Sequence, residues 1–260
     1  MSGIKRIVVK VGTSSLTHDT GKINLKQMEK LVTVLSNLMN MGIEVILVSS
    51  GAVGVGSGKI GLNNKPATTR QKQALAAIGQ ASLMFMYEKF FMEYGYTTGQ
   101  VLLNRFVFDN EQHFNSASDA FNTMIEYGVI PIVNENDVIS SYEIEIGDND
   151  TLSAYVAKLT KADLLVILSD IDGFYDGDPS LETSKLISVV EEITDEILSC
   201  AGGAGSRRGT GGMQTKLNAA EIIHNDGIDM IIANGNRPEN LYDIIEGKSI
   251  GTLFKGKKKD

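Results

Sequence analysis

The sequence is poor in cysteine and histidine, and this scarcity excludes several kinds of site. Cys200 is the only cysteine, so the chain forms no intrachain disulfide, and a single thiol is typical of a reducing compartment such as the cytoplasm. None of the histidines, His18, His113 and His224, has a partner at the spacing of a zinc site. No G-x-S-x-G motif is present. We therefore expect a chemistry that needs neither zinc nor a Ser-His-Asp triad.

Long apolar runs and an excess of positive charge are also absent. No apolar run approaches the roughly 20 residues of a membrane-spanning helix. The first apolar run is too short for a signal peptide, and Lys10 interrupts it. The formal net charge is −8, which disfavours general binding to nucleic acid. We therefore expect a cytoplasmic protein whose ligands are small molecules, without a membrane or nucleic-acid partner.

The hydrophobic pattern predicts an α/β protein. The 260 residues are 42% hydrophobic and 22% charged, which is enough for one large or two small globular domains. Apolar strand-like runs alternate with helical stretches, and no repeat or low-complexity linker separates them. We expect a single domain over residues 1–260, built as a three-layer α/β/α sandwich with a mostly parallel central sheet. The expected strands are 4–11, 43–48, 96–103, 129–133, 164–168 and 228–233, with a hairpin at 138–146.

The longest predicted helix, residues 67–94, is rich in alanine. Its small and apolar residues recur at helical spacing, which predicts close packing against a neighbouring surface. That surface is either the core of the domain or a second subunit, and we expect the core. The face consists of Ala74, Ala77, Ile78, Ala81 and Phe85.

Polar and glycine residues follow the ends of the predicted strands. Parallel strands of an open α/β sheet present their carboxyl ends at one edge, where ligands bind. We therefore expect these segments to form a single site. They are residues 10–12, 49–54, 134–137, 169–170 and 234–235.

A glycine-rich segment near the C-terminus has the pattern of an anion site. Gly211 and Gly212 end a flexible segment, and a helix-like run that carries Lys216 follows. Unpaired N–H groups and the positive end of a helix dipole favour an anion at such a turn. The segment is not a Walker A motif, because its lysine follows Thr215 rather than a glycine. A plain glycine-rich surface loop is the alternative.

Two lysines and a group of carboxylates and amides are the candidates for catalysis. Lys10 and Lys216 can neutralise a moving phosphoryl group, and an aspartate between them would orient both. A carboxylate acceptor suits this site because its oxygen, with a pKa of about 4, needs no general base at neutral pH. Asp148 or Asn149 could instead be a helix N-cap. The carboxylates and amides are Asp137, Asp148, Asn149 and Asp150.

Several motifs together resemble those of the amino acid kinase family. Lys-Val-Gly-Thr-Ser at 10–14, Ser-Asp at 169–170 and Gly-Thr-Gly-Gly-Met-Gln-Thr-Lys at 209–216 are similar to the family's nucleotide and phosphate sites. Other motifs are similar to the members that phosphorylate L-glutamate. These are Ser-Ser-Gly-Ala-Val at 49–53, Ala-Ala-Ile-Gly-Gln at 76–80, Asn-Glu-Asn-Asp at 134–137 and Gly-Asp-Asn-Asp at 147–150. The resemblance runs from residue 10 to residue 254.

The resemblance implies a reaction and a role for each matching residue. ATP, with Mg²⁺ carried mainly on its phosphates, would phosphorylate the γ-carboxylate of L-glutamate to glutamyl 5-phosphate, the first step of proline synthesis. Lys10 and Lys216 would hold the phosphates, and Asp150 would orient both lysines. The residues implied for glutamate are Ser50, Gly51, Asp137 and Asn149. Those implied for the nucleotide, besides the two lysines, are Gly12, Ser169, Asp170, Thr210, Gly211, Gly212, Met213 and Gln214.

The resemblance also implies partners. Proline would be a feedback inhibitor, and the chain would form a homodimer or a larger homo-oligomer through the kinase domain. Many family members carry a C-terminal PUA domain, and we expect none here. The glycines at 202–205 indicate an arm that orders when ATP binds. Two alternatives are a kinase of another small acid and a non-catalytic nucleotide-binding regulatory or storage protein on the same fold.

Overall fold

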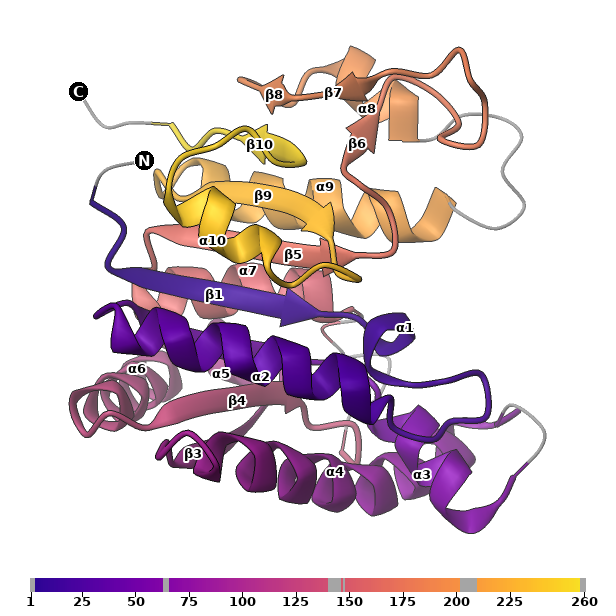
Figure 1. The fold of residues 1–260 in the computed structure, drawn as a ribbon, viewed down its shortest axis with the longest axis vertical. Coiled ribbons are helices and arrows are strands. Elements are labelled where there is room, and N and C mark those ends of the chain that lie inside the picture. The colour runs from indigo at the N-terminus through magenta and orange to yellow at the C-terminus, as the bar shows by residue number, and fades with distance from the viewer. Residues whose placement is uncertain (1–2, 63–65, 140–145, 147, 202–209, 258–260) are drawn as a thin grey trace.

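A mostly parallel sheet of eight strands forms the centre of the fold (Figure 1). The structure is a computed structural model, and it describes residues 3–62, 66–139, 146, 148–201 and 210–257. The sheet is parallel except where its seventh strand meets its sixth. In spatial order the strands are β3 (Thr98–Leu103), β4 (Ile130–Glu135), β2 (Glu44–Ser49), β1 (Arg6–Val11), β5 (Leu164–Ser169), β9 (Asp229–Asn234), β10 (Thr252–Phe254) and β8 (Val189–Val190). A separate antiparallel pair consists of β6 (Phe174–Tyr175) and β7 (Leu186–Ile187).

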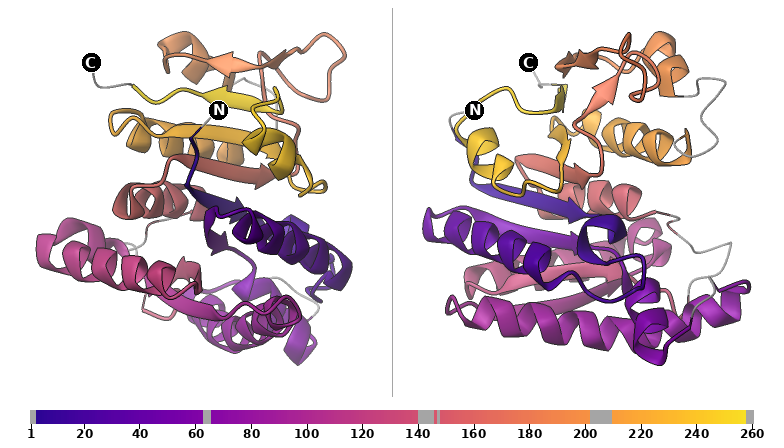
Figure 2. Two further views of the ribbon diagram at one scale, coloured as in Figure 1. Left: turned by 60° about the vertical axis from the view of Figure 1, so that its left-hand side comes forward. Right: turned by 45° about the vertical axis from the view of Figure 1, so that its right-hand side comes forward.

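Helices cover both faces of the sheet, which gives three layers (Figures 1 and 2). One face packs against α2 (Leu25–Asn40), α4 (Thr69–Met92) and α10 (Asn240–Ile245). The other face packs against α6 (Glu111–Glu126), α7 (Asn149–Thr160) and α9 (Thr210–His224). The remaining helices are α1 (Thr13–Leu16), α3 (Ala52–Ile60), α5 (Arg105–Asp109) and α8 (Asp195–Ala201). The predicted α/β/α sandwich is confirmed. Within the described residues, no helix combines the length and apolar character needed to cross a membrane.

The central strand β1 shows how the pattern of side chains places Lys10. Ile7 and Val9 belong to the core on the α2 side, whereas Val8 belongs to the core on the α7 side. Successive side chains of a strand point to opposite faces. Lys10 therefore shares the face of Val8, which α7 and α9 cover. The lysine lies one residue before the end of the strand and is only 8% exposed.

The predicted strands are present, with ends that shift by a few residues. The largest functional consequence is in β4, which extends to Glu135, so that Asn134 and Glu135 are strand residues rather than loop residues. The hairpin predicted at 138–146 lies mostly outside the described residues, and the arm predicted at 202–205 lies wholly outside them.

The prediction for the buried face of α4 is wrong. Ala74, Ala77 and Ala81 are exposed, and the side chain of Phe85 is 65% exposed. Alanine and larger apolar residues occur on almost every side of this helix, so their spacing does not identify the inward face. The buried residues are Leu75, Ala76, Gly79, Gln80, Leu83, Tyr87 and Phe91.

Helices α3 and α4 pack with their backbones close together. A Cβ atom built on Gly56 of α3 would lie 2.0 Å from the backbone oxygen of Leu75, and one built on Gly79 of α4 would lie 1.8 Å from the backbone oxygen of Ala52. Neither position can therefore hold a side chain without separating the helices. The glycine-rich segment after β2 is thus a helix whose glycines permit this contact.

We expect Gly56→Ala to lower the free energy of unfolding by about 2–3 kcal/mol, because the new methyl group overpacks the α3–α4 contact. Gly54→Ala is the matched control in the same helix, since its Cβ would lie 3.6 Å from the nearest side-chain atom, Cγ2 of Thr13. Alanine favours a helix over glycine by up to about 1 kcal/mol, so the control should be as stable as the wild type or slightly more stable. Urea unfolding followed by circular dichroism measures the stability of both variants. Equal stabilities of Gly56→Ala and Gly54→Ala would contradict the packing interpretation.

Candidate active site

The carboxyl ends of five strands meet at one edge of the sheet. Lys10 of β1 is paired in register with Val48 of β2 and Ile167 of β5, and Ser169 at the end of β5 is paired with Asn234 at the end of β9. Figure 1 shows the arrowheads of β1, β4 and β9 at the same side of the molecule. The polar segments predicted to share one edge are therefore neighbours.

A buried carboxylate connects the two predicted lysines. Lys10 Nζ lies 2.6 Å from Asp150 Oδ1, and Lys216 Nζ lies 3.0 Å from Asp150 Oδ2. Asp150 is 1% exposed and each lysine is 8% exposed. The lysines come from β1 and α9, whereas the carboxylate comes from the first turn of α7. Lys10, Asp150 and Lys216 together carry one net positive charge, which favours a phosphate beside them.

The start of α7 fixes the position of Asp150. The side chain of Asp148 caps this helix and accepts a hydrogen bond of 2.5 Å from the backbone N–H of Asp150. From α9, the hydroxyl of Thr215 donates to Asp150 Oδ2 at 3.1 Å. Lys216 is also tied to its own helix, because its Nζ donates to the backbone oxygen of Gly212 at 3.0 Å. Of the two N-cap candidates, the structure therefore assigns the cap to Asp148.

The two carboxyl groups at the start of α7 have pKa values shifted in opposite directions. Burial opposes ionisation of Asp150, but the charges of Lys10 and Lys216 outweigh it, and the pKa lies below its ordinary value. Burial raises the pKa of Asp148, and the negative charge of Asp150 raises it further. Asp150 is thus held as a carboxylate by its partners, while Asp148 carries its charge at a cost.

A cluster of amide and hydroxyl groups lies beside the lysines. Asn149 Nδ2 is 3.1 Å from the backbone oxygen of Ser49, 2.9 Å from Ser50 Oγ and 2.9 Å from Asn134 Oδ1. Gly51 follows in a left-handed conformation, with φ of 104°, and opens α3. The structure therefore brings together Ser50, Gly51 and Asn149, three of the four residues predicted for the amino acid.

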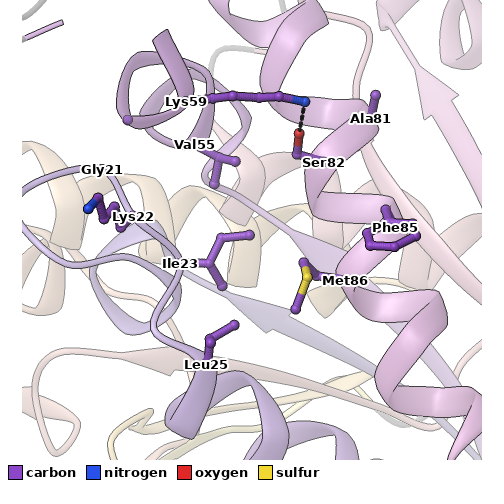
Figure 3. A pocket seen from close by; sticks show the side chains of 11 residues that line it. Gly21, Lys22, Ile23, Leu25, Val55, Lys59, Ala81, Ser82, Phe85 and Met86 are labelled. Atoms are coloured by element: carbon purple, nitrogen blue, oxygen red, sulfur yellow. Dashed lines mark hydrogen bonds between the residues drawn. The ribbon is translucent and has the colours of Figure 1, made fainter. Parts of the chain in front are cut away.

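The fourth predicted residue, Asp137, lies in a turn directly after β4. It borders a cavity of about 280 Å³ between α4 and the ends of β3 and β4, which Gln80 and Glu135 also line. A larger cavity, of about 530 Å³, lies between α3, α4 and residues 21–25, and contains none of the predicted site residues (Figure 3). Its lining is mostly apolar, and a hydrogen bond of 2.8 Å between Lys59 Nζ and Ser82 Oγ crosses one end.

The residues predicted for the nucleotide occupy the other half of the edge. Gly12 follows β1 and opens α1, and Ser169 ends β5 with its hydroxyl 3.1 Å from Asp170 Oδ1. The glycine-rich segment differs from the prediction, because α9 begins at Thr210. Gly211, Gly212, Met213 and Gln214 are thus already helical. Glycines in a first turn keep the helix N-terminus open to a large anion.

Two residues that hold the site together were not among the predicted catalytic or binding residues, although Asn134 belongs to the segment 134–137 expected at this edge. Thr215 contacts Asp150, and Asn134 contacts Asn149. Asn134 was detectable from its place after an apolar run, whereas nothing in the sequence connects Thr215 to a residue 65 positions away. The described part of the chain gathers no group of three or more His, Cys, Asp or Glu side chains suited to a metal ion.

The model of the amino acid kinase family matches residues 5–234, and the chain belongs to this family. It is similar over nearly its whole length to two bacterial proteins named glutamate 5-kinase. The one from Clostridium perfringens is 59% identical over 259 residues, which cover 98% of this chain and 96% of the relative. The one from Caldanaerobacter subterraneus subsp. tengcongensis is 55% identical over 250 residues, which cover 96% of this chain and 67% of the relative.

Two solved structures share the fold at much lower identity. UMP kinase from Bacillus anthracis superposes with a TM-score of 0.67 at 15% identity, and the match covers 98% of this chain and 97% of that one. The isopentenyl phosphate kinase product complex from T. acidophilum gives a TM-score of 0.66 at 20% identity, covering 96% and 100%. The predicted family and fold class are confirmed.

Asp150→Asn should lower the free energy of unfolding at pH 7 by about 3–5 kcal/mol, because it leaves two buried lysines facing a neutral amide. The folded-state pKa of Asp150 lies below its unfolded value of about 3.9. Its stabilisation is therefore present above the unfolded pKa and is lost as the pH falls through the folded-state pKa. Urea unfolding of the wild type and of Asp150→Asn should show that their difference in free energy of unfolding decreases as the pH falls.

Asp148→Asn is the matched control for this experiment, since asparagine also caps a helix. The pKa of Asp148 is raised in the folded state, so the stability linked to this group is present at low pH and lost as the pH rises through the folded-state pKa. The variant should be at least as stable as the wild type at pH 7. A loss equal to that of Asp150→Asn would contradict the distinction between the two carboxyl groups.

Proposed function

We propose that this chain transfers the γ-phosphoryl group of ATP to the γ-carboxylate of L-glutamate and forms glutamyl 5-phosphate and ADP, the first step of proline synthesis. The observation that carries the proposal is the buried Lys10–Asp150–Lys216 cluster, with the Asn149 amide cluster directly beside it. The similarity to proteins named glutamate 5-kinase over nearly the whole chain selects glutamate among small acids.

The proposed reaction is a direct in-line displacement. A γ-carboxylate oxygen forms a bond to the γ-phosphorus, the bond to the oxygen that bridges the β- and γ-phosphates breaks, and ADP leaves with that electron pair. The carboxylate is ionised at neutral pH, so no proton needs to be removed from the nucleophile. The barrier lies in bringing two anions together, and catalysis consists mainly of positioning and charge neutralisation.

The two lysines perform that neutralisation. Each ammonium is fixed by one oxygen of Asp150, so both charges are in place before the substrates bind and need no reorganisation. Burial excludes water from the cluster and strengthens its interaction with a phosphoryl group. Asp150 itself accepts no proton in this scheme, and it acts by aiming Lys10 and Lys216.

Glutamate and the nucleotide would bind at different halves of the sheet edge. The glutamate would lie along Ser50, Gly51 and Asn149, with its α-ammonium toward Asp137 at the cavity beyond β4. The nucleotide would lie over Gly12, Ser169 and Asp170 and against the first turn of α9. We assign Mg²⁺ to the phosphates of ATP, where this ion keeps most of its water ligands.

Assembly, inhibition and location complete the proposal. The chain would form one kinase domain over residues 1–260, act in the cytoplasm and be inhibited by proline. A homo-oligomer is supported by the outer face of α4, where Phe85 and Met92 are each 65% exposed. Ala74, Ala77 and Ala81 are exposed on the same side of α4, and a contiguous apolar patch of this kind is typical of an interaction site.

The function is tested by measuring ATP consumption with glutamate, N-acetylglutamate, aspartate and UMP in parallel. We expect turnover with glutamate and at least about 100-fold lower kcat/KM with the other acceptors, because their ammonium or carboxylate groups are missing or displaced. Turnover with one of the others but none with glutamate would assign the site to another small acid. ATP binding without turnover of any acceptor would favour the non-catalytic alternative.

Lys216→Ala should lower kcat by about two to three orders of magnitude, as expected for a group that stabilises charge in the transition state. The fold should survive because Asp150 keeps its ion pair with Lys10. Lys158→Ala is the control, since this lysine of α7 forms an exposed pair with Asp226 at 3.1 Å. Steady-state kinetics and circular dichroism measure both variants. Near-normal turnover of folded Lys216→Ala would remove this lysine from the proposed reaction.

A further inference from the structure

A chain of three side-chain amides connects α4 to the candidate active site. Asn134 Nδ2 donates to Gln80 Oε1 at 2.9 Å, and Asn149 Nδ2 donates to Asn134 Oδ1 at 2.9 Å. Gln80 and Asn134 are buried, with 8% and 3% exposure. The amides come from α4, β4 and α7, and only the last of them is a residue predicted to bind the amino acid.

Two backbone groups fix the direction of this chain of amides. The N–H of Glu135 donates to Asn134 Oδ1 at 2.9 Å, and the carbonyl of Ser49 accepts from Asn149 Nδ2 at 3.1 Å. A backbone N–H can only donate and a backbone carbonyl can only accept, so neither amide can be reversed without facing two donors or two acceptors. Gln80 must therefore supply the acceptor for Asn134 Nδ2.

The same direction determines which atom Asn149 presents. Every hydrogen bond that its side chain makes within the described residues uses Nδ2. Its Oδ1 is thus the atom left to accept from a ligand, and an ammonium group is the complementary donor. Because Gln80 Oε1 accepts from Asn134, and Asn134 Oδ1 accepts from Asn149, the oxygen Oδ1 of Asn149 is the atom presented to the candidate site.

The packing of α4 explains why Gln80 is well placed for this role. Gly79, the preceding residue, lies against the backbone of α3, which begins directly after Ser50 and Gly51. Two turns further along α4, the buried hydroxyl of Tyr87 lies 2.8 Å from Ser49 Oγ. Gln80 and Tyr87 thus tie one face of α4 to the ends of β4 and β2, the two strands that hold Asn149.

We propose that Gln80 is a positioning residue for the amino-acid substrate. It satisfies the buried Nδ2 of Asn134, keeps Oδ1 of Asn134 toward Asn149, and so holds Asn149 Oδ1 in the orientation that accepts from the α-ammonium group. Gln80 acts through Asn134 and Asn149. The inference rests on the proposed function for the identity of the amino acid, and it gives a physical role to the Gly-Gln pair of the motif at 76–80.

Gln80→Met removes the acceptor at nearly constant volume and leaves Asn134 Nδ2 unsatisfied. We expect KM for glutamate to rise by about 10-fold, the effect of one lost buried hydrogen bond, while KM for ATP and kcat stay within about threefold. Gln80→Glu keeps an acceptor at the same place and should hold KM for glutamate within about threefold of the wild type. Thermal unfolding should show both variants folded at the assay temperature.

A double-mutant cycle with Asn149→Ala separates positioning from general packing. If Gln80 acts through Asn149, Gln80→Met should change KM for glutamate by less than twofold when Asn149 is already alanine. A full additive change in that background would overturn the proposal. So would an unchanged KM in Gln80→Met, or equal losses in Gln80→Met and Gln80→Glu.

Failure of the proposed function would be visible separately, in the wild type. If the wild type phosphorylates a different amino-bearing acid, the same four proteins test the chain of amides with that acid. If it phosphorylates none, the cycle is read from the Kd for glutamate, measured by isothermal titration calorimetry. Coupling between positions 80 and 149 supports the proposal, and additivity overturns it.

Discussion

The burial of Asp150 is the constraint on which the site depends. A carboxylate removed from water is costly unless it is fully paired, and here each of its oxygens faces a lysine. The pairing requires β1, α7 and α9 to meet at one point, although Lys10 and Lys216 lie near opposite ends of the chain. A change that separates β1, α7 and α9 would leave the buried carboxylate unpaired and lower the free energy of unfolding. The pairing of Asp150 with the two lysines therefore stabilises this edge of the sheet and also holds both lysines in place for the proposed phosphoryl transfer.

The surroundings of Asp150 divide the edge into two halves with different chemistry. On one side, the first turn of α9 and the ends of β1 and β5 offer backbone N–H groups and an excess of positive charge, which suits phosphates. On the other side, Ser50, Asn134 and Asn149 offer neutral groups with fixed hydrogen-bonding directions, which suit an amino acid. In the proposed reaction, a phosphoryl group passing from one half to the other would cross the two lysines.

Close backbone packing between α3 and α4 positions α4 against the amino-acid half of the edge. Glycines at positions 56 and 79 let α3 and α4 approach until no side chain fits between them. Gln80 and Tyr87 are consequently held against the ends of β4 and β2. The outer face of the same helix exposes Phe85. The inner face of α4 thus supports the amino-acid half of the edge, and its outer face is exposed and apolar.

The sequence by itself determined the sheet, its direction and the identity of the lysines, because nearly continuous apolar runs and the polar residues at their ends are local signals. It also indicated the family through short contiguous motifs. The inward face of α4 was missed because alanine and larger apolar residues together occur on almost every side of the helix, so their spacing does not identify the buried face. Only the tertiary structure decided that Asp148 caps α7, that Thr215 supports Asp150 and that Gln80 reaches Asn149 through Asn134. These are contacts between side chains from different elements, and their direction depends on where neighbouring backbone donors and acceptors lie.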